Sequence, residues 1–248
     1  MALREDLSRQ GNWLFKRRSY LPLLILPVLL IALRNYGILE TYLGKAAGDI
    51  YGVFCIIISY IGLLIRSLTI GYTPERTSVR STDHQIADTL NTTGMYSIVR
   101  HPLYLGNFVV FLGMILFIQV LWFTLISILA FFIYYERIMY AEEEFLRDKF
   151  GDSYVEWSKQ TPAFIPKFKY WKTPDLSFSF KNVLKREYSG FFTIIISYTV
   201  IEVLGNYIAT SQFELDLEWL VFLSIGGIIY LVLRTINKTT KILHVEGR

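Results

Sequence analysis

The chain has 248 residues, of which 53% are hydrophobic and only 19% are charged. Soluble domains are usually about 45–50% apolar and about 25% charged, and here the apolar residues fall in long blocks, so the composition argues against an ordinary soluble domain. The single cysteine, Cys55, excludes an intramolecular disulfide and a multi-cysteine metal site. The net charge of +4 is modest, and its distribution along the chain is more informative than its size.

Residues 1–18 contain the first predicted element, an amphipathic helix that lies in the membrane interface. Between residues 3 and 18, four apolar residues are interleaved with five basic ones: Leu3, Leu7, Trp13 and Phe15 with Arg4, Arg9, Lys16, Arg17 and Arg18. This segment lacks an apolar stretch followed by a small-residue cleavage site, so we do not expect it to be a cleavable signal peptide.

Six apolar runs follow, and each approaches the roughly 20 residues that a helix needs to cross a hydrocarbon core of about 30 Å. Backbone groups in lipid must pair within their own segment, so we predict helices for all of them. The predicted spans are 20–36, 46–72, 103–119, 120–140, 190–210 and 219–236. The fold class is therefore an all-α, polytopic membrane helical bundle of about six transmembrane helices, with a cofactor pocket on the cytoplasmic side.

The lysines and arginines lie mostly on one side of this predicted bundle. With six spans both termini face the same side, which carries the basic residues of segments 3–18, 76–100, 137–186 and 234–248. The last loop on the opposite side is acidic, with Glu214, Asp216 and Glu218. The positive-inside rule then makes both termini cytoplasmic, in a bacterial inner membrane or an endomembrane.

A polar turn stands directly before the apolar run that begins at Leu103. Its distinctive residues are Tyr96, Arg100, His101, Tyr104 and Gly106. The N-terminus of a helix offers unpaired N–H groups that attract anions such as a carboxylate. A structural alternative stays open, because Pro102 is a common helix start signal and His101 could simply cap the helix.

A second polar cluster, Glu142-Glu143-Glu144, follows the next apolar run, so two polar clusters bracket one hairpin on the same side. A run of charges is usually a solvated face. This run, however, continues a membrane helix into the interface, and consecutive positions point in different directions. One or two of the glutamates can therefore turn inward toward the Arg-His-Pro turn. A helix is also predicted over 142–159, interrupted at Gly151.

Two charged residues fall inside predicted spans. Glu202 lies near the middle of the fifth span, where a carboxylate is costly and indicates a function unless it only locks helix packing, with Asn206 as its partner. Arg66 lies toward the cytoplasmic end of the second span, and we expect it to snorkel to the interface.

Several other chemistries are disfavoured. No Gly-x-Gly-x-x-Gly segment follows a strand and no Walker motif is present, which excludes a soluble Rossmann-type cofactor fold. The three histidines, His84, His101 and His244, are scattered without metal-ligand spacing, so we expect no metal site. We expect no nucleic-acid partner either.

The first polar block, Gly94-x-Tyr96-x-x-x-Arg100-His101-Pro102-x-Tyr104-x-Gly106, resembles the signature of integral-membrane methyltransferases, which include isoprenylcysteine carboxyl methyltransferases and phospholipid N-methyltransferases. A second block, running from Arg137 through Glu142-Glu143, Gly151 and Trp157, is similar to that family's second motif. The resemblance implies S-adenosylmethionine as the cofactor, held by these residues: Tyr96, Arg100, His101, Tyr104, Gly106, Glu142 and Glu143. It also implies three parts: the interfacial helix 1–18, a methyltransferase core 19–170, and a linker with an additional transmembrane hairpin 171–248.

The implied reaction moves a methyl group to a membrane lipid or a lipidated acceptor, with Arg137, Glu142 and Glu143 as the expected catalytic residues. A carboxylate or phosphate acceptor needs no base, and a cation such as Arg137 or Arg100 would position it. An amine acceptor needs a base, for which Glu142 or Glu143 is the candidate. Two alternatives remain open: a membrane reductase of related helical build with a nicotinamide cofactor, and a non-enzymatic transporter or scaffold.

Overall fold

The structure is a computed structural model that describes residues 3–18, 20–74, 87–213 and 215–248, and the regular elements within those ranges are helices. In chain order they are α1 (Leu3–Lys16), η1 (Leu21–Ile25), α2 (Leu26–Ala32), η2 (Leu33–Asn35), α3 (Ile38–Leu43), α4 (Lys45–Gly71), α5 (Met95–Ile98), α6 (Pro102–Phe117), α7 (Leu121–Phe150), α8 (Asp152–Gln160), η3 (Phe168–Tyr170), α9 (Phe180–Thr210) and α10 (Leu217–Thr239). Arg76, Arg80, His84 and Glu214, which entered the sequence analysis, lie outside the described residues.

Within the described ranges, five helical segments are long and apolar enough to cross a membrane: Leu21–Leu43, α4, α7, α9 and α10. The sixth predicted span is α6, an apolar helix of 16 residues. At 1.5 Å per residue α6 is about 24 Å long, which is less than a typical hydrocarbon core. The prediction of an all-α bundle with about six transmembrane helices is thus confirmed, with α6 as its short member.

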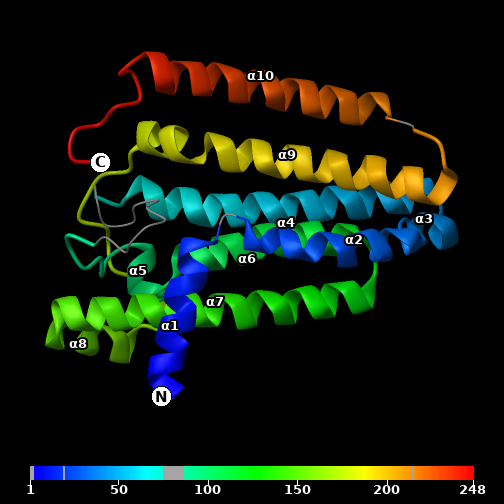
Figure 1. Ribbon diagram of the computed structural model, residues 1–248. Helices are drawn as coiled ribbons and strands as arrows, with labels where there is room; N and C mark the ends of the chain where they lie inside the picture. The colour runs from blue at the N-terminus through cyan, green and yellow to red at the C-terminus, as the bar shows by residue number, and fades with distance from the viewer. Residues whose placement is uncertain (1–2, 19, 75–86, 214) are drawn as a thin grey trace.

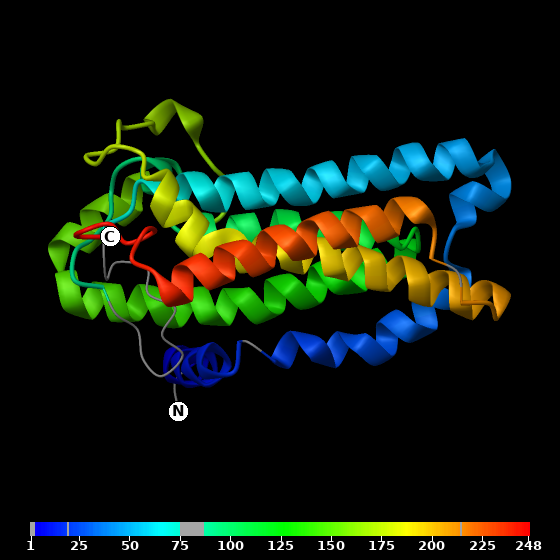
Figure 2. The same cartoon turned by 90° about the horizontal axis from the view of Figure 1, so that it is seen from above.

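The long helices run side by side along one axis (Figures 1 and 2). The short helices α5 and α8 and the C-terminus lie at one end of the bundle, and α3 lies at the other end. The first span is divided into short helical pieces, because proline at positions 22 and 27 removes backbone donors and Gly37 has a φ of +73°.

Two helices extend beyond the predicted membrane spans. α7 continues past Tyr140 to Phe150, as expected where the glutamates continue a membrane helix into the interface, and α9 begins at Phe180, before the predicted span starts at Gly190. An apolar run marks only the part of a helix that lipid covers, whereas the helix itself continues until a local signal stops it. Gly151, with a φ of +55°, ends α7, and the interruption there is as predicted. Ser179 caps α9 by accepting from the Asn182 N–H.

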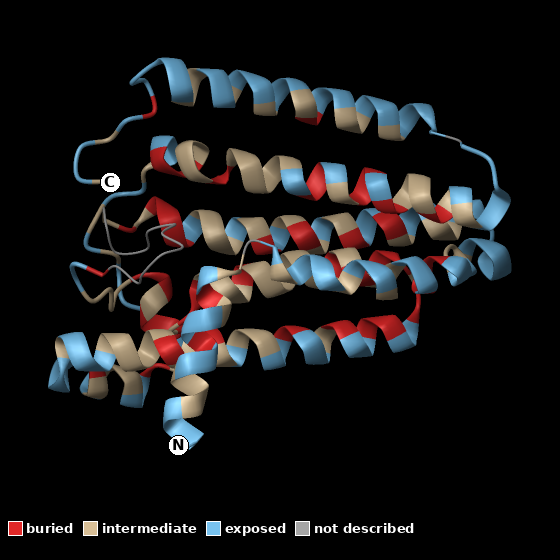
Figure 3. Cartoon of the chain, viewed as in Figure 1, coloured by how far each residue is buried: buried red, intermediate tan, exposed pale blue. Residues whose placement is uncertain are grey.

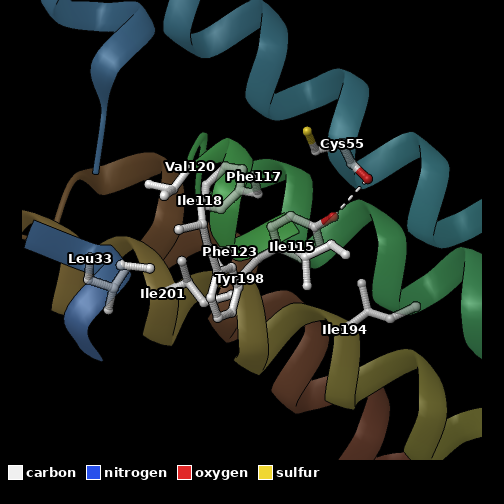
Figure 4. Close-up of a cluster of buried hydrophobic side chains, with 11 residues drawn as sticks. Leu33, Cys55, Ile115, Phe117, Ile118, Val120, Phe123, Ile194, Tyr198 and Ile201 are labelled. Atoms are coloured by element: carbon white, nitrogen blue, oxygen red, sulfur yellow. Dashed lines mark hydrogen bonds between the residues drawn. The ribbon is translucent and has the colours of Figure 1, made fainter. Parts of the chain in front are cut away.

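The buried core lies between α4, α6 and α9 and the end of the first span (Figure 4). Tyr198 of α9 lies within it and donates a hydrogen bond to the Cys55 carbonyl of α4 at 2.7 Å. α4 and α6 approach closely, because a Cβ at Gly62 would stand 2.5 Å from the Val110 nitrogen and one at Gly113 would stand 2.4 Å from Ser59 Oγ. Small residues at such crossings are typical of helix packing in membranes.

The outer surface of the bundle is apolar. α10 is largely exposed along its length, and the outer faces of α4, α7 and α9 carry many exposed aliphatic and aromatic side chains (Figure 3). Contiguous apolar surface on this scale is expected where lipid is the solvent.

α1 lies across α7 rather than along it (Figures 1 and 2). The crossing point is Gly11, where a Cβ would stand 2.1 Å from the Arg137 carbonyl oxygen. Phe15 is buried at this contact, whereas Trp13 on the same helix is exposed. A helix lying across the bundle with aromatic and basic residues on its outer face fits the predicted interfacial position, which stays a prediction.

Candidate active site

The Arg-His-Pro turn connects the short helix α5 to α6, and the backbone changes direction before and after α5. Gly94, with a φ of +57°, leads into α5, and His101 stands as the N-cap residue of α6 with Pro102 in its first turn. His101 therefore stands at a helix start, as the structural alternative in the sequence analysis expected. Its side chain makes no capping hydrogen bond and is available for other contacts.

The proline-rich segment after α8 holds this turn in place. The N–H of Arg100 donates to the Pro162 carbonyl at 2.8 Å, and the N–H of His101 donates to the Ala163 carbonyl at 3.2 Å. From α8 itself, Trp157 Nε1 donates to the Tyr96 carbonyl at 3.1 Å. The fold thus brings the two polar blocks of the sequence together.

Two of the three clustered glutamates turn toward the histidine, as the sequence predicted. His101 Nε2 lies 3.0 Å from Glu143 Oε1, and His101 Nδ1 lies 3.6 Å from Glu142 Oε2. Arg100 donates to Glu143 Oε2 at 3.0 Å, and the Tyr104 hydroxyl donates to Glu142 Oε1 at 2.5 Å. We call these five side chains the central network.

Glu144, the third glutamate, faces away from the central network. It pairs instead with Arg4 of α1 and, at 3.4 Å, with Arg147 one turn further along α7. Successive helical positions are about 100° apart, so three consecutive glutamates cannot share one face.

Burial and charge act against each other at His101, which is 6% exposed. Burial alone would lower the pKa of the imidazole, but hydrogen bonds that the ring makes to Glu142 and Glu143, together with their negative charge, outweigh it and raise the pKa above its usual 6.5. Burial also raises the pKa of the Tyr96 phenol, and the nearby Glu142 carboxylate raises it further. The two carboxylates thus favour the protonated form of the His101 ring that lies between them.

Arg137 does not belong to the central network. Its Nε donates to Gln10 of α1 at 2.9 Å, and its terminal nitrogen donates to the Ile133 carbonyl at 2.8 Å. On an α-helix, position 137 is rotated by about 140° from position 142 and about 120° from position 143, so its side chain leaves α7 on a different side.

Gly106 contributes to the site through packing. A Cβ at this position would stand 2.5 Å from Arg66 Cγ and 2.9 Å from the Gly62 carbonyl oxygen. The glycine of the first motif therefore lets α4 lie directly against the first turns of α6, next to Tyr104.

Comparison with known proteins places this geometry in a family. Residues 48–153 match the model of the phospholipid methyltransferase family, and that stretch contains the whole central network. This segment is similar to the integral-membrane methyltransferases. α8 begins within the matched segment and ends beyond it, whereas α9 and α10 lie entirely beyond it.

The individual relatives are named either as methyltransferases or as metal-resistance proteins. Protein-S-isoprenylcysteine O-methyltransferase of Schizosaccharomyces pombe is 35% identical over 89 residues, which is 36% of each chain. Protein-S-isoprenylcysteine O-methyltransferase B of Arabidopsis thaliana is 38% identical over 82 residues, 31% of this chain and 39% of the relative. The cobalt-zinc-cadmium resistance protein CzcN of Cupriavidus metallidurans is 35% identical over 85 residues, 34% of this chain and 39% of the relative.

Each of these matches covers less than two fifths of the relative's own length. The chain therefore spans less than two fifths of the length of these relatives. No solved structure matches the chain.

The methyltransferase family implies S-adenosylmethionine as the methyl donor, and two buried polar atoms of the site fit such a ligand. Arg100 Nε and the Tyr154 hydroxyl are buried and lack a hydrogen-bond partner among the described residues. Tyr154 lies beside Glu143 and Arg100, and burial, with the Glu143 charge, raises the pKa of its phenol. Unpaired donors of this kind are rare in buried positions, and they suit an anionic group such as the cofactor's carboxylate.

Sequence reasoning missed one part of the site region. Arg66 does not snorkel, and that expectation was wrong: it forms a bidentate ion pair with Glu187 of α9, at 2.8 and 2.7 Å. Its third nitrogen donates to Asn107 of α6 at 2.6 Å. The sequence did contain a signal for this ion pair, because Arg66 and Glu187 carry opposite charges at the same end of two apolar helices.

Glu202 lies far from the central network, beside the end of the first span. It accepts a hydrogen bond from the Tyr36 hydroxyl and, at 3.1 Å, one from the predicted partner Asn206. Gly205 on the same face of α9 packs against the Tyr36 ring. These contacts join α9 to the first span and fit the packing role considered for Glu202.

Proposed function

We propose that this protein is an integral-membrane methyltransferase that moves a methyl group from S-adenosylmethionine to a lipid or a lipidated acceptor at the cytoplasmic membrane face. The observation that carries the proposal is the central network itself. Two motif blocks, about 40 residues apart in a segment that matches the family, close into one cluster around a buried histidine.

The cofactor would be held by the central network together with Tyr96 and Gly106. Arg100, with its unpaired Nε, suits the cofactor's carboxylate, and the carboxylates of Glu142 and Glu143 suit its positive charges. His101 keeps the two glutamates apart and oriented, and Tyr104 fixes the direction of Glu142. Gly106 acts indirectly, by allowing α4 to pack against the site.

When bound, S-adenosylmethionine supplies an electrophilic methyl group that an acceptor takes in a single in-line displacement. The protein's tasks are then alignment of the acceptor and exclusion of water. The sequence also named Arg137 as the cation for a carboxylate or phosphate acceptor, but its side chain leaves α7 on another side and contacts Gln10 and the Ile133 carbonyl. Arg100, the other cation considered, lies in the central network and is the proposed orienting cation. For an amine acceptor, Glu142 or Glu143 would remove the proton. Both acceptor classes remain within the proposal.

Access follows from the arrangement of the helices. The central network lies at the end of the bundle that holds α5, α8 and the C-terminus (Figure 1), and the excess of basic residues supports a cytoplasmic position for this end. The polar cofactor would enter from that side, and the apolar acceptor would arrive laterally between helices. In liposomes with the cofactor confined to one side, methyl transfer should require cofactor on the side of the termini. Transfer driven by cofactor on the opposite side alone would refute this topology.

Calorimetric titration with S-adenosylhomocysteine, the product form of the cofactor, tests the proposed function. We expect saturable binding of one molecule per chain and no binding of a reduced nicotinamide dinucleotide phosphate. Binding of the nicotinamide compound in place of S-adenosylhomocysteine would point to a reductase. A folded protein that binds neither would leave the methyltransferase proposal without support.

A further inference from the structure

The ion pair between Arg66 and Glu187 joins the methyltransferase segment to a helix outside it. Arg66 belongs to α4, within residues 48–153, whereas Glu187 belongs to α9. The side chains are 17% and 4% exposed, and both nitrogens of one guanidinium edge meet both carboxylate oxygens. A bidentate pair of this kind fixes the plane of the guanidinium as well as its position.

The fixed guanidinium determines the orientation of Asn107. Arginine can only donate hydrogen bonds, so the Asn107 atom at 2.6 Å from it must be the amide oxygen. The NH₂ group of Asn107 is therefore directed away from the guanidinium. The Glu187 carboxylate thus fixes, through Arg66, which way the Asn107 amide faces.

Tyr135 of α7 packs on a residue of the central network. Its ring centroid lies 4.9 Å from that of Tyr104, and Tyr104 donates to Glu142 at 2.5 Å. Tyr104 and Asn107 are three positions apart on α6 and so share one face of the helix. Gly106 between them lets the Arg66 stem lie against the same turn.

We propose that Glu187 is a positioning residue for the methyl-transfer site, acting through Arg66 and Asn107 on Tyr104, so that α9 is a working part of the enzyme. The inference rests on the proposed function and assigns a role to the helix that follows the methyltransferase segment.

The test compares four variants: Glu187→Gln, Glu187→Asp, the double variant Arg66→Gln/Glu187→Gln, and Lys181→Gln. The Glu187→Gln variant leaves a buried guanidinium without its counter-charge, which lowers stability whatever the role of the pair. The double variant removes both charges and so removes that penalty, while it also removes the fixed guanidinium. Lys181 is exposed on the same helix, and its substitution serves as the matched control for the loss of one charge.

Two quantities are measured on folded protein: the affinity for S-adenosylhomocysteine, and the transfer of labelled methyl groups from S-adenosylmethionine into membranes that contain the protein. We expect the double variant to unfold near the wild-type temperature, yet to lose about tenfold to hundredfold in methyl transfer and to bind S-adenosylhomocysteine more weakly. Glu187→Asp should restore part of the transfer rate, and Lys181→Gln should behave as the wild type.

A double variant that binds and transfers as the wild type does would show that the pair only holds helices together, and would overturn the inference. If the proposed function itself were wrong, the wild-type protein would bind no S-adenosylhomocysteine. That result distinguishes a wrong function from a wrong role for Glu187.

Discussion

Removal of the His101 side chain is the most informative perturbation of the central network. In His101→Ala, Glu142 and Glu143 lose the cation between them, and Arg100 remains as the positive charge in contact with Glu143. We expect the variant to lose binding of S-adenosylhomocysteine, because the two carboxylates are no longer held apart in one orientation.

The cost in stability can be worked out from the contacts. The 3.0 Å contact with Glu143 has hydrogen-bond geometry, and a hydrogen bond to a charged group contributes about 1.5–3 kcal/mol. The 3.6 Å contact with Glu142 contributes less than about 1 kcal/mol, since both glutamates keep 20–24% exposure and solvent screens the pair. The sum is about 2–4 kcal/mol, which for a domain of this size lowers the unfolding temperature by roughly 5–15 °C.

The same substitution predicts a pH dependence. The folded protein raises the pKa of His101 above the unfolded value of 6.5, so the imidazolium contributes its full stability below about pH 6.5 and loses it as the pH rises through the folded pKa. The difference in unfolding temperature between the wild type and His101→Ala should therefore be largest near pH 6 and narrow toward pH 9. Thermal unfolding in detergent across this range, with calorimetry at one pH, measures both effects. A difference that widens with pH, or unchanged affinity in a folded variant, would refute the reasoning.

Three further substitutions probe the parts around the central network. Arg137→Ala should leave S-adenosylhomocysteine affinity and methyl transfer near the wild-type values, because its guanidinium contacts Gln10 and the Ile133 carbonyl rather than the central network; a large loss of transfer in a folded variant would return Arg137 to the acceptor site. Glu202→Gln should keep its activity, since the amide preserves shape and hydrogen-bonding ability beside Tyr36; a large loss of turnover at normal thermal stability would instead place Glu202 in the acceptor path. Gly62→Ala should destabilise the protein by about 1–3 kcal/mol, because the new Cβ would stand 2.7 Å from the Gly106 carbonyl, and an unchanged unfolding temperature would contradict that close approach.

The sequence predicted those parts of the site that depend on residues near the end of one helix. The Arg-His-Pro turn and the glutamates each stand at the polar end of an apolar helix, and a tight hairpin between α6 and α7 brings those ends together. The inward direction of Glu142 and Glu143 and the outward direction of Glu144 follow from the helical repeat. The same repeat, applied to Arg137, would have placed it away from the glutamates.

Contacts between distant helices were not predictable in the same way. Arg66 and Glu187 are 121 positions apart, and their pairing depends on how α9 docks against α4. The role of Gly106 likewise becomes visible only when α4 lies against it, since a glycine in a sequence motif is compatible with a ligand or with a neighbouring helix. Helix boundaries were displaced because lipid-facing composition and backbone helicity end at different residues.

Mass spectrometry of the membrane lipids and lipidated proteins tests the central claim most directly. Membranes that contain the wild-type protein and receive S-adenosylmethionine should yield a species carrying one added CH₂ group. Membranes with the double variant Glu142→Gln/Glu143→Gln should lack that species. The appearance of the same species with the double variant, or of no methylated species with the folded wild-type protein, would contradict methyl transfer at the central network.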